Sequence, residues 1–173
     1  MRFYRNVIIL AVVLITLIGV YLYLQNQDTA KSQKDKVLVK SFDKNSIVQI
    51  DMQNNHGLIS LIKNGAEWKM LKPKEYKLDK VLTDSFVNKI YDLKAEDIIE
   101  ENTQNFEKYG LKNPKSTVVV KTSGGKTSTF MLGDETPVEE GYYLRMSEMN
   151  TVYRVDTYTA GDFLRSVNEF IKK

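Results

Sequence analysis

Residues 117–132 read TVVVKTSGGKTSTFML, and this stretch decides how the second half of the chain folds. Thr117 to Lys121 is rich in β-branched residues, which favour a strand. Thr127 to Leu132 combines β-branched residues with alternation, which is typical of a second strand. Between them, Gly124-Gly125 suits a tight two-residue turn of the I′ or II′ kind. The stretch therefore predicts an antiparallel hairpin.

The same stretch contains Gly125-Lys126-Thr127, which raises the alternative of a nucleotide-binding loop. That loop has the spacing G-x-x-x-x-G-K-[ST], and a helix follows it so that free N–H groups face the phosphates. Here Val120 stands at the first glycine position, and residues 127–132 lack helical periodicity. We therefore expect no nucleotide to bind at this turn and no ATPase chemistry.

Upstream, residues 46–93 predict a three-stranded meander followed by a helix. Ile47–Met52, Leu58–Lys63 and Glu67–Leu71 alternate as strands, and Asn64-Gly65 is typical of a hairpin turn. The period then changes to that of a helix with one apolar face. Asp79 is its candidate N-cap. The apolar residues of this face are Leu78, Leu82, Phe86, Ile90 and Leu93.

Downstream, residues 115–172 predict a second meander followed by a helix over Ala160–Ile171. Between the two units we expect a polar joint over Lys94–Glu101, then helical turns within Asn102–Tyr109 that end at Gly110. The expected fold is α+β, an N-terminal transmembrane helix followed by two antiparallel β-meander-plus-helix units of about 46–93 and 115–172. The two meanders form either separate sheets or one shared sheet.

The N-terminal segment predicts a membrane anchor. Residues 7–24 form an uncharged 18-residue run, about 27 Å long as a helix, which matches the hydrocarbon core of a bilayer. Arg2 and Arg5 precede it, so the positive-inside bias places residues 1–6 in the cytoplasm and the remainder outside. Residues 25–37 (QNQDTAKSQKDKV) then form a flexible stalk, and residues 38–173 an extracytoplasmic α+β domain.

A cleaved signal peptide is the alternative to this anchor. The apolar run is longer than an ordinary signal peptide core and ends in bulky Tyr21–Leu24, which favours an uncleaved signal-anchor. The chain has no Cys, which excludes a lipoprotein anchor, disulfides and thiol nucleophiles. Its formal net charge is only +3, so composition gives no argument for nucleic acid.

Residue types that carry chemistry are present but lack the spacing that chemistry needs. His56 is the only histidine and lies in an Asn-Asn-His-Gly turn. The loop acids do not follow the EF-hand pattern and show no catalytic pair, so we expect no catalytic, cofactor-binding or metal residues. These acids are Glu96, Asp97, Glu100, Glu101, Asp134, Glu135, Glu139 and Glu140.

Several motifs resemble one bacterial family. They are Trp68…Pro73…Tyr76…Asp79, then Lys108–Pro114 (KYGLKNP), then Leu132-Gly-Asp134…Tyr142–Arg145 (YYLR)…Val152–Val155 (VYRV). The chain resembles the family named domain of unknown function 4340 over roughly residues 40–172. The resemblance implies a membrane-anchored, envelope-exposed protein, in some cases encoded near ABC-transporter parts and gliding-type auxiliary proteins, and it carries over no catalytic residue. We interpret its motif residues as structural: Trp68, Tyr109, Gly110, Leu111, Pro114 and Gly133.

We therefore expect a single-pass membrane-anchored extracytoplasmic interaction module, an accessory of an ABC transporter or an envelope assembly. Residues 7–24 would contact the bilayer, and the partner would be an envelope protein, with no nucleic acid and no nucleotide. The expected partner contacts are Asp134, Glu135, Tyr142, Tyr143 and Arg145. The alternative is a cell-wall or glycan-binding module that uses exposed Tyr and Trp. An envelope hydrolase is the third and least supported hypothesis.

Overall fold

The computed structural model describes residues 13–21, 36–43, 45–138 and 140–172. The chain divides into two compact units, Met1–Asp35 and Lys36–Lys173, and each is described by itself. In the first unit, residues 13–21 are helical with exposed apolar side chains. Across the described ranges, no helix is both long and apolar enough to cross a membrane. The rest of the expected anchor and most of the expected stalk lie outside the described residues: 1–12 and 22–35.

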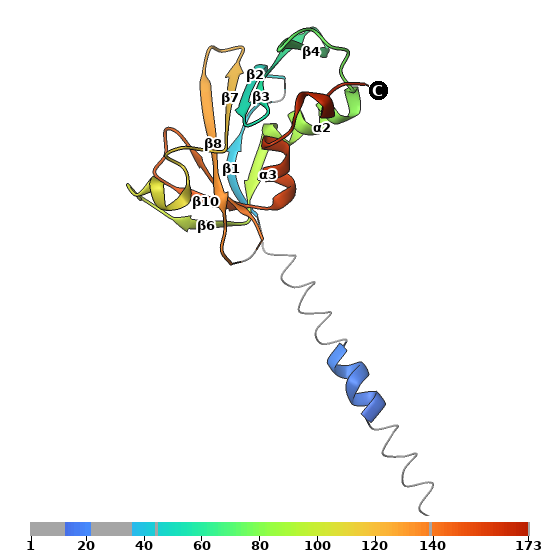
Figure 1. The fold of residues 1–173 in the computed structure, drawn as a ribbon, viewed down its shortest axis with the longest axis vertical. Helices are drawn as coiled ribbons and strands as arrows, with labels where there is room; N and C mark the ends of the chain where they lie inside the picture. Colours follow the sequence, from blue (N-terminus) through green and yellow to red (C-terminus); the bar gives the residue numbers. More distant parts are fainter. Residues whose placement is uncertain (1–12, 22–35, 44, 139, 173) are drawn as a thin grey trace, which may run out of the picture. The chain divides into compact units, whose positions relative to one another are not determined.

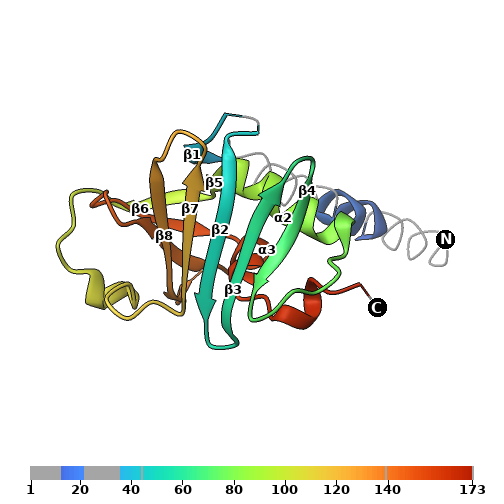
Figure 2. The same cartoon turned by 90° about the horizontal axis from the view of Figure 1, so that it is seen from above.

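The second unit is built on one eight-stranded sheet in which all neighbouring strands are antiparallel (Figures 1 and 2). The α+β class with antiparallel sheets is confirmed. The two meanders share this sheet because β2 pairs with β7. The strand order is β4-β3-β2-β7-β8-β9-β10-β6. The bounds are β2 Ile47–Asn54, β3 Gly57–Asn64, β4 Glu67–Lys72, β6 Asp97–Glu100, β7 Ser116–Thr122, β8 Thr127–Glu135, β9 Tyr142–Met146 and β10 Val152–Val155.

The central hairpin β7–β8 confirms the prediction made from residues 117–132. The kind of turn was predicted wrongly. Thr122 pairs with Lys126 and accepts a 2.9 Å hydrogen bond from the N–H of Gly125, so the loop is the three residues 123–125. Of the two glycines only Gly125 has a positive φ, 76°. This is the three-residue hairpin loop that ends in a left-handed residue, rather than a two-residue I′ or II′ turn.

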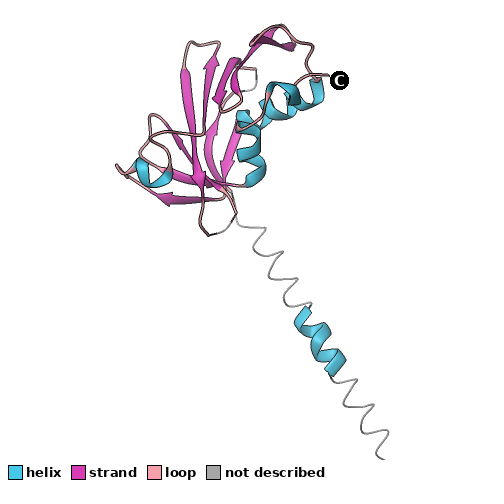
Figure 3. Cartoon of the chain, viewed as in Figure 1, coloured by secondary structure: helices cyan, strands magenta, loops and turns pink. Residues whose placement is uncertain are grey.

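Helix α2 (Lys80–Tyr91) and helix α3 (Thr157–Phe163) cover one face of the sheet, as Figures 2 and 3 show. Asp79 caps α2 as predicted, because its carboxylate accepts from the N–H of Leu82 at 3.0 Å. The main core lies between the sheet and these helices. It includes Ile50, Met52, Leu61, Phe86, Ile90, Phe130, Leu132, Leu144, Phe163 and Phe170.

The predicted helix over Ala160–Ile171 was wrong, since α3 ends at Phe163. Two buried side chains take the carbonyl groups at its end. Ser116 Oγ donates to the Phe163 carbonyl at 2.6 Å, and Asn54 Nδ2 donates to the carbonyls of Phe163 at 3.2 Å and Arg165 at 2.9 Å. With these carbonyls satisfied, the chain turns into a short 3₁₀ helix, η2 (Val167–Glu169).

The polar joint predicted over Lys94–Glu101 was also wrong, because two strands occupy it. β5 (Asp92–Ala95) pairs with β1 (Val37–Ser41) in a separate two-stranded sheet, and β6 follows directly. Leu93 and Ala95 are buried while Asp92 and Lys94 are exposed, which is the alternation of a half-buried strand. Polar residues such as Lys94, which suggested a loop, lie on the solvent-exposed side of this strand.

The folded unit begins two residues before the predicted boundary. Lys36, expected in the stalk, forms ion pairs with Glu96 at 2.5 Å and Asp156 at 2.9 Å. Val37 is already in β1. Burial of the Asp156 carboxyl opposes its ionisation. Hydrogen bonds from the Thr159 N–H and from Lys36 outweigh this effect and lower the pKa of Asp156 to about 2. Asp156 is also the N-cap of α3, so one carboxylate joins the start of the unit to its last α-helix.

Candidate functional site

An exposed apolar surface lies at the β6 edge of the sheet. Ile98 and Ile99 on β6 are 42% and 40% exposed, and Val138 in the loop between β8 and β9 is 76% exposed. They line a depression of about 390 Å³ together with Thr136, Pro137 and Tyr143, and with the ion-paired Asp97 and Arg154. We call Ile98, Ile99, Pro137, Val138 and Tyr143 the β6 surface. Contiguous exposed apolar residues of this kind mark contact sites.

The backbone of β6 explains why two neighbouring isoleucines are both exposed. β6 is a terminal strand of the sheet, and β10 is its one strand neighbour among the described residues. Its register shifts between Ile98, which is opposite Tyr153, and Glu100, which is opposite Val152. Ile99 is thus an extra residue in a β-bulge, which bends the strand.

Polar contacts with β10 and with Tyr109 hold β6 in place. The Arg154 guanidinium donates to Asp97, and the N–H of Glu96 donates to the Arg154 carbonyl at 2.7 Å. The Tyr109 hydroxyl donates to Glu100, which lowers the pKa of that carboxyl. β6 is therefore fixed by its neighbours although it is only a four-residue strand.

Tyr109 belongs to the KYGL motif, which packs onto β8. Gly110 ends the 3₁₀ helix η1 (Phe106–Tyr109) with φ 67°, as predicted. A Cβ on Gly110 would lie 2.5 Å from the Asp134 carboxyl carbon, and one on Gly133 would lie 2.1 Å from the Tyr109 carbonyl oxygen. Both glycines are therefore needed for close approach of the two segments. Tyr109 and Leu111 bury a second, smaller core with Val152 on β10.

The other two motif residues lie at different places. Pro114 precedes Lys115, whose N–H donates to the Leu132 carbonyl at 2.8 Å, so it stands where the chain returns to the sheet. Trp68 lies on β4 and packs against the main core. The structure therefore joins Tyr109, Gly110, Leu111 and Gly133 in one junction and leaves Trp68 out of it.

The five predicted contact residues do not form one patch. Tyr142 packs against the main core, and its hydroxyl donates to Glu135 at 2.5 Å. Asp134 forms an exposed ion pair with Lys115 at 3.2 Å. These three predicted residues, Asp134, Glu135 and Tyr142, are absent from the lining of the β6 depression.

Tyr143 and Arg145 lie on the opposite face from Tyr142, because successive strand residues alternate. The Tyr143 ring packs edge-on against Tyr109, with centroids 4.8 Å apart. The Arg145 guanidinium carbon lies 3.8 Å from the centroid of Phe106, and burial lowers the pKa of this side chain. Only Tyr143 of the predicted set lines the depression. Sequence reasoning missed Ile98 and Ile99, although an apolar pair within the acidic run EDIIEE is a readable signal.

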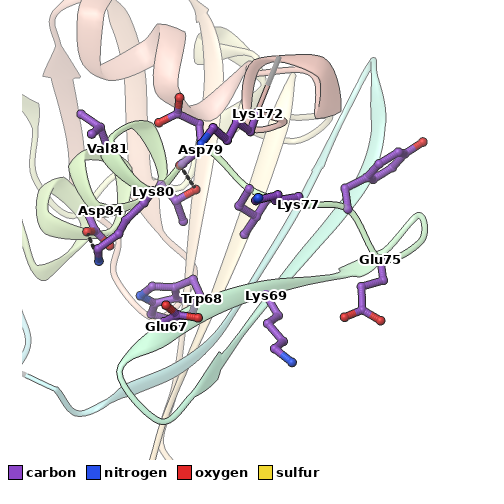
Figure 4. Close-up of a pocket in the computed structure, with 13 residues that line it drawn as sticks. Glu67, Trp68, Lys69, Glu75, Lys77, Asp79, Lys80, Val81, Asp84 and Lys172 are labelled. Atoms are coloured by element: carbon purple, nitrogen blue, oxygen red, sulfur yellow. Dashed lines mark hydrogen bonds and ion pairs between the residues drawn. The ribbon is translucent and has the colours of Figure 1, made fainter.

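A groove with many charged lining residues lies at the β4 edge of the sheet, between β4 and the start of α2. It has a volume of about 610 Å³, and Trp68 and Tyr76 line it. Figure 4 shows Trp68 on β4 across from Lys80 and Asp84, which form an ion pair at 2.8 Å on α2. A second depression of about 780 Å³ shares these three residues, so we call both together the Trp68 groove. The charged lining of the first depression is balanced: Lys69, Lys77, Lys80 and Lys172 against Glu67, Glu75, Asp79 and Asp84.

Neither surface has the donor set of a metal site. Within the described ranges, no group of three or more His, Cys, Asp or Glu side chains could hold a metal ion. His56 lies in the β2–β3 turn, where its N–H donates to Asn54 Oδ1 at 2.8 Å. Of the acids in the loop between β8 and β9, Glu139 lies outside the described residues.

Comparison with known proteins gives one match. The model of the family described as Domain of unknown function (DUF4340) matches residues 68–173. The match begins in β4 and includes α2, β6, the KYGL motif and the second meander. No curated protein and no solved structure matches the chain.

Proposed function

The chain belongs to the DUF4340 family, and we propose that it is a membrane-anchored, extracytoplasmic module that binds a protein partner through the β6 surface. The observation that carries this proposal is the contiguous exposure of Ile98, Ile99 and Val138 around one depression. Larger contiguous apolar patches that remain exposed on a folded protein commonly mark sites of protein–protein contact. A component of an ABC transporter or of an envelope assembly is the class of partner that the resemblance suggests.

The proposed anchor rests on the N-terminal sequence. Residues 7–24 carry no charge, and their described part, residues 13–21, is helical with its apolar side chains exposed. The β6 surface lies where the chain enters the folded unit, since Lys36 bonds to Glu96 and β6 begins at the next residue.

Co-purification of matched variants tests the proposal. The full-length chain is purified in mild detergent from its own membranes as wild type, Ile99→Lys and Leu71→Lys. Leu71 is an exposed apolar residue on β4, the opposite edge strand, so its variant controls for the added charge. We expect the same envelope protein with the wild type and with Leu71→Lys, and its loss with Ile99→Lys. Equal recovery by both variants would reject the β6 surface as the contact.

The Trp68 groove supports a second function, the binding of a cell-wall glycan. The observation that favours it is that Trp68 and Tyr76 line one groove whose rim offers charged and polar groups on both sides (Figure 4). Tyr142 instead packs on the core and its hydroxyl bonds to Glu135. We therefore place the proposed glycan site at Trp68 on β4 rather than at Tyr142 on β9. Co-sedimentation of the full chain with peptidoglycan, lost in Trp68→Ala and kept in Tyr142→Phe, is its test. No sedimentation above a control protein removes this function.

A further inference from the structure

We propose that β6 accepts an extended segment of the partner as an additional strand of the sheet, and that this segment has apolar residues flanked by Lys or Arg. The inference rests on the proposed function, because it names the kind of partner that the same surface binds. It follows from three features of the β6 edge: open backbone groups, an adjoining apolar depression and acidic flanks.

The open backbone comes from the place of β6 in the sheet. β6 is the last strand of the order, and its described pairing is to β10 alone. An edge strand presents N–H and C=O groups that no neighbouring strand bonds, and such a row is a template for another extended segment. Contacts from Arg154 to Asp97 and from Tyr109 to Glu100 fix the side chains of β6 from within the domain. The template is therefore ordered before a partner arrives.

The depression beside β6 supplies side-chain recognition. In strand addition, backbone hydrogen bonds give affinity, while pockets for alternate side chains give specificity. The lining of the depression of about 390 Å³ includes Ile98 and Ile99 from β6, Pro137 and Val138 from the loop between β8 and β9, and Tyr143 from β9. A Val, Ile or Leu of an added strand would bury its side chain there and would cover the exposed isoleucines.

The flanks of the β6 edge are acidic. Residues 96–101 read EDIIEE, so the apolar pair has two carboxylates on each side. Three of them have basic neighbours within the domain, Lys36 at Glu96, Arg154 at Asp97 and Lys108 at Glu100. Residues opposite Asp97 and Glu100 on an added strand would still be cross-strand neighbours of carboxylates, where opposite charges are favourable. Basic residues on both sides of an apolar centre complement this arrangement.

A second copy of this chain fits the edge less well. A two-fold dimer pairs identical edge strands antiparallel. With Ile98 opposite Ile99 of the other copy, Asp97 would lie opposite Glu100 twice, and like charges directly opposite are destabilising. The bulge at Ile99 also bends β6, and a bent edge pairs less readily with a second copy of itself than a flat edge does. The occupant is therefore a strand of a different chain.

The test uses the full chain in lipid nanodiscs and synthetic peptides as probes. The peptide acetyl-Gly-Lys-Val-Val-Lys-Gly-amide carries the proposed pattern, and its Glu-for-Lys version reverses the flanking charge. Two further versions carry backbone N-methyl groups on every second residue. One version is methylated on the odd-numbered residues and the other on the even-numbered residues, and we call these the two frames. Titration measures affinity, and hydrogen exchange measures protection of the β6 amides.

Strand addition predicts saturable binding of the Lys peptide and slower exchange of the outward-facing β6 amides. The Glu peptide is expected to bind at least tenfold more weakly. One N-methylated frame should lose tenfold or more in affinity while the other keeps it, because only alternate residues bond to β6. Ile99→Lys is expected to abolish binding, and the matched Leu71→Lys variant to leave it unchanged.

Three outcomes overturn the inference, and they are distinct from failure of the proposed function. Equal affinity of both N-methylated frames would show that no backbone pairing forms. Peptide binding without protection of the β6 amides would place the peptide elsewhere. Protection that grows with protein concentration and needs no peptide would identify a second copy as the occupant. In the first two cases, an envelope protein that co-purifies with wild type and not with Ile99→Lys would still support the proposed function.

Discussion

The two edge strands of the sheet differ in how they avoid contact with other chains. β4 carries exposed Glu67, Lys69 and Lys72, and Pro73 follows it directly. Charges and proline are the usual protection of an edge strand. β6 is short, bulged and flanked by acids, yet it exposes two isoleucines at its centre. The exposed isoleucines are what distinguish β6 from β4, and on them we base the proposal that β6 is the edge that accepts another strand.

The surfaces beside the two edges follow the same division. The Trp68 groove at β4 is lined by five lysines and four acids around one Trp. The depression at β6 has only two charged residues, the ion-paired Asp97 and Arg154, beside Ile98, Ile99 and Val138. A groove rich in charged groups suits a polar ligand, and a depression with exposed isoleucines suits a protein segment.

The largest effect is expected from Gly133→Ala, which attacks the support of the β6 end. The added Cβ would lie 2.1 Å from the Tyr109 carbonyl oxygen, a backbone atom that moves only with its segment. We expect a loss of about 2–3 kcal/mol in the free energy of unfolding, as for an overpacked site. Urea denaturation measures it. Gly124→Ala is the matched control, since nothing lies within 4 Å of its Cβ and its φ is not positive. A similar loss in both variants would contradict the close approach.

Asp156→Ala is expected to cost about 1–2 kcal/mol at pH 7, because the variant removes an N-cap and the partner of Lys36. The pKa of Asp156 is about 2 in the folded chain, below the ordinary 3.8. The ionised group therefore stabilises the fold above about pH 4, and this contribution is lost as the pH falls toward 2. Chemical denaturation across this range should show the variant and the wild type converging. A difference that stays constant from pH 7 to pH 2 would disprove the ionic contribution.

Ile99→Lys is expected to change the free energy of unfolding by less than about 0.5 kcal/mol while it abolishes partner binding. Ile99 is a bulged, exposed residue of an edge strand, so the fold loses few contacts. Thermal unfolding measures stability, and the Leu71→Lys variant serves as the control for both properties. A strongly destabilised Ile99→Lys protein would mean that β6 belongs to the core rather than to an interface.

The smallest effect is expected from Asp84→Ala in the Trp68 groove. Its ion pair with Lys80 is exposed and spans one helical turn, so its contribution to stability should be small and confined to low salt. The difference should vanish at high salt, because exposed charges are screened. Urea denaturation at two salt concentrations measures it. A cost that persists at high salt would show that the groove depends on this pair for its packing.

Local signals in the sequence predicted the parts of the fold that local chemistry determines. The hairpin of residues 117–132, the Asp79 cap and the Gly110 stop all follow from residues within a few positions of each other. The end of α3 does not, because Asn54 bonds to a carbonyl 109 residues away. β1 and β5 were missed for the same reason: their pairing joins residues 37–41 to residues 92–95.

The candidate site was only partly predictable. The sequence pointed to the loop and strand near Tyr143, which does line the depression, but Tyr142 is on the other face. Ile98 and Ile99 were read as part of a polar joint, because four acids surround them. Their exposure depends on β6 being the last strand of the sheet, and strand order is a property of the whole topology. The pair within EDIIEE could have drawn attention to these residues, but no local pattern shows that their strand is the last of the sheet.

Site-specific photo-crosslinking tests the central claim, that β6 is the edge that meets the partner. A photoreactive amino acid is placed at position 99 on β6 or at position 71 on β4, in the full chain within its own membranes. We predict a crosslink to one envelope protein from position 99 and none from position 71. A crosslink to that protein from position 71, with none from position 99, would contradict the account.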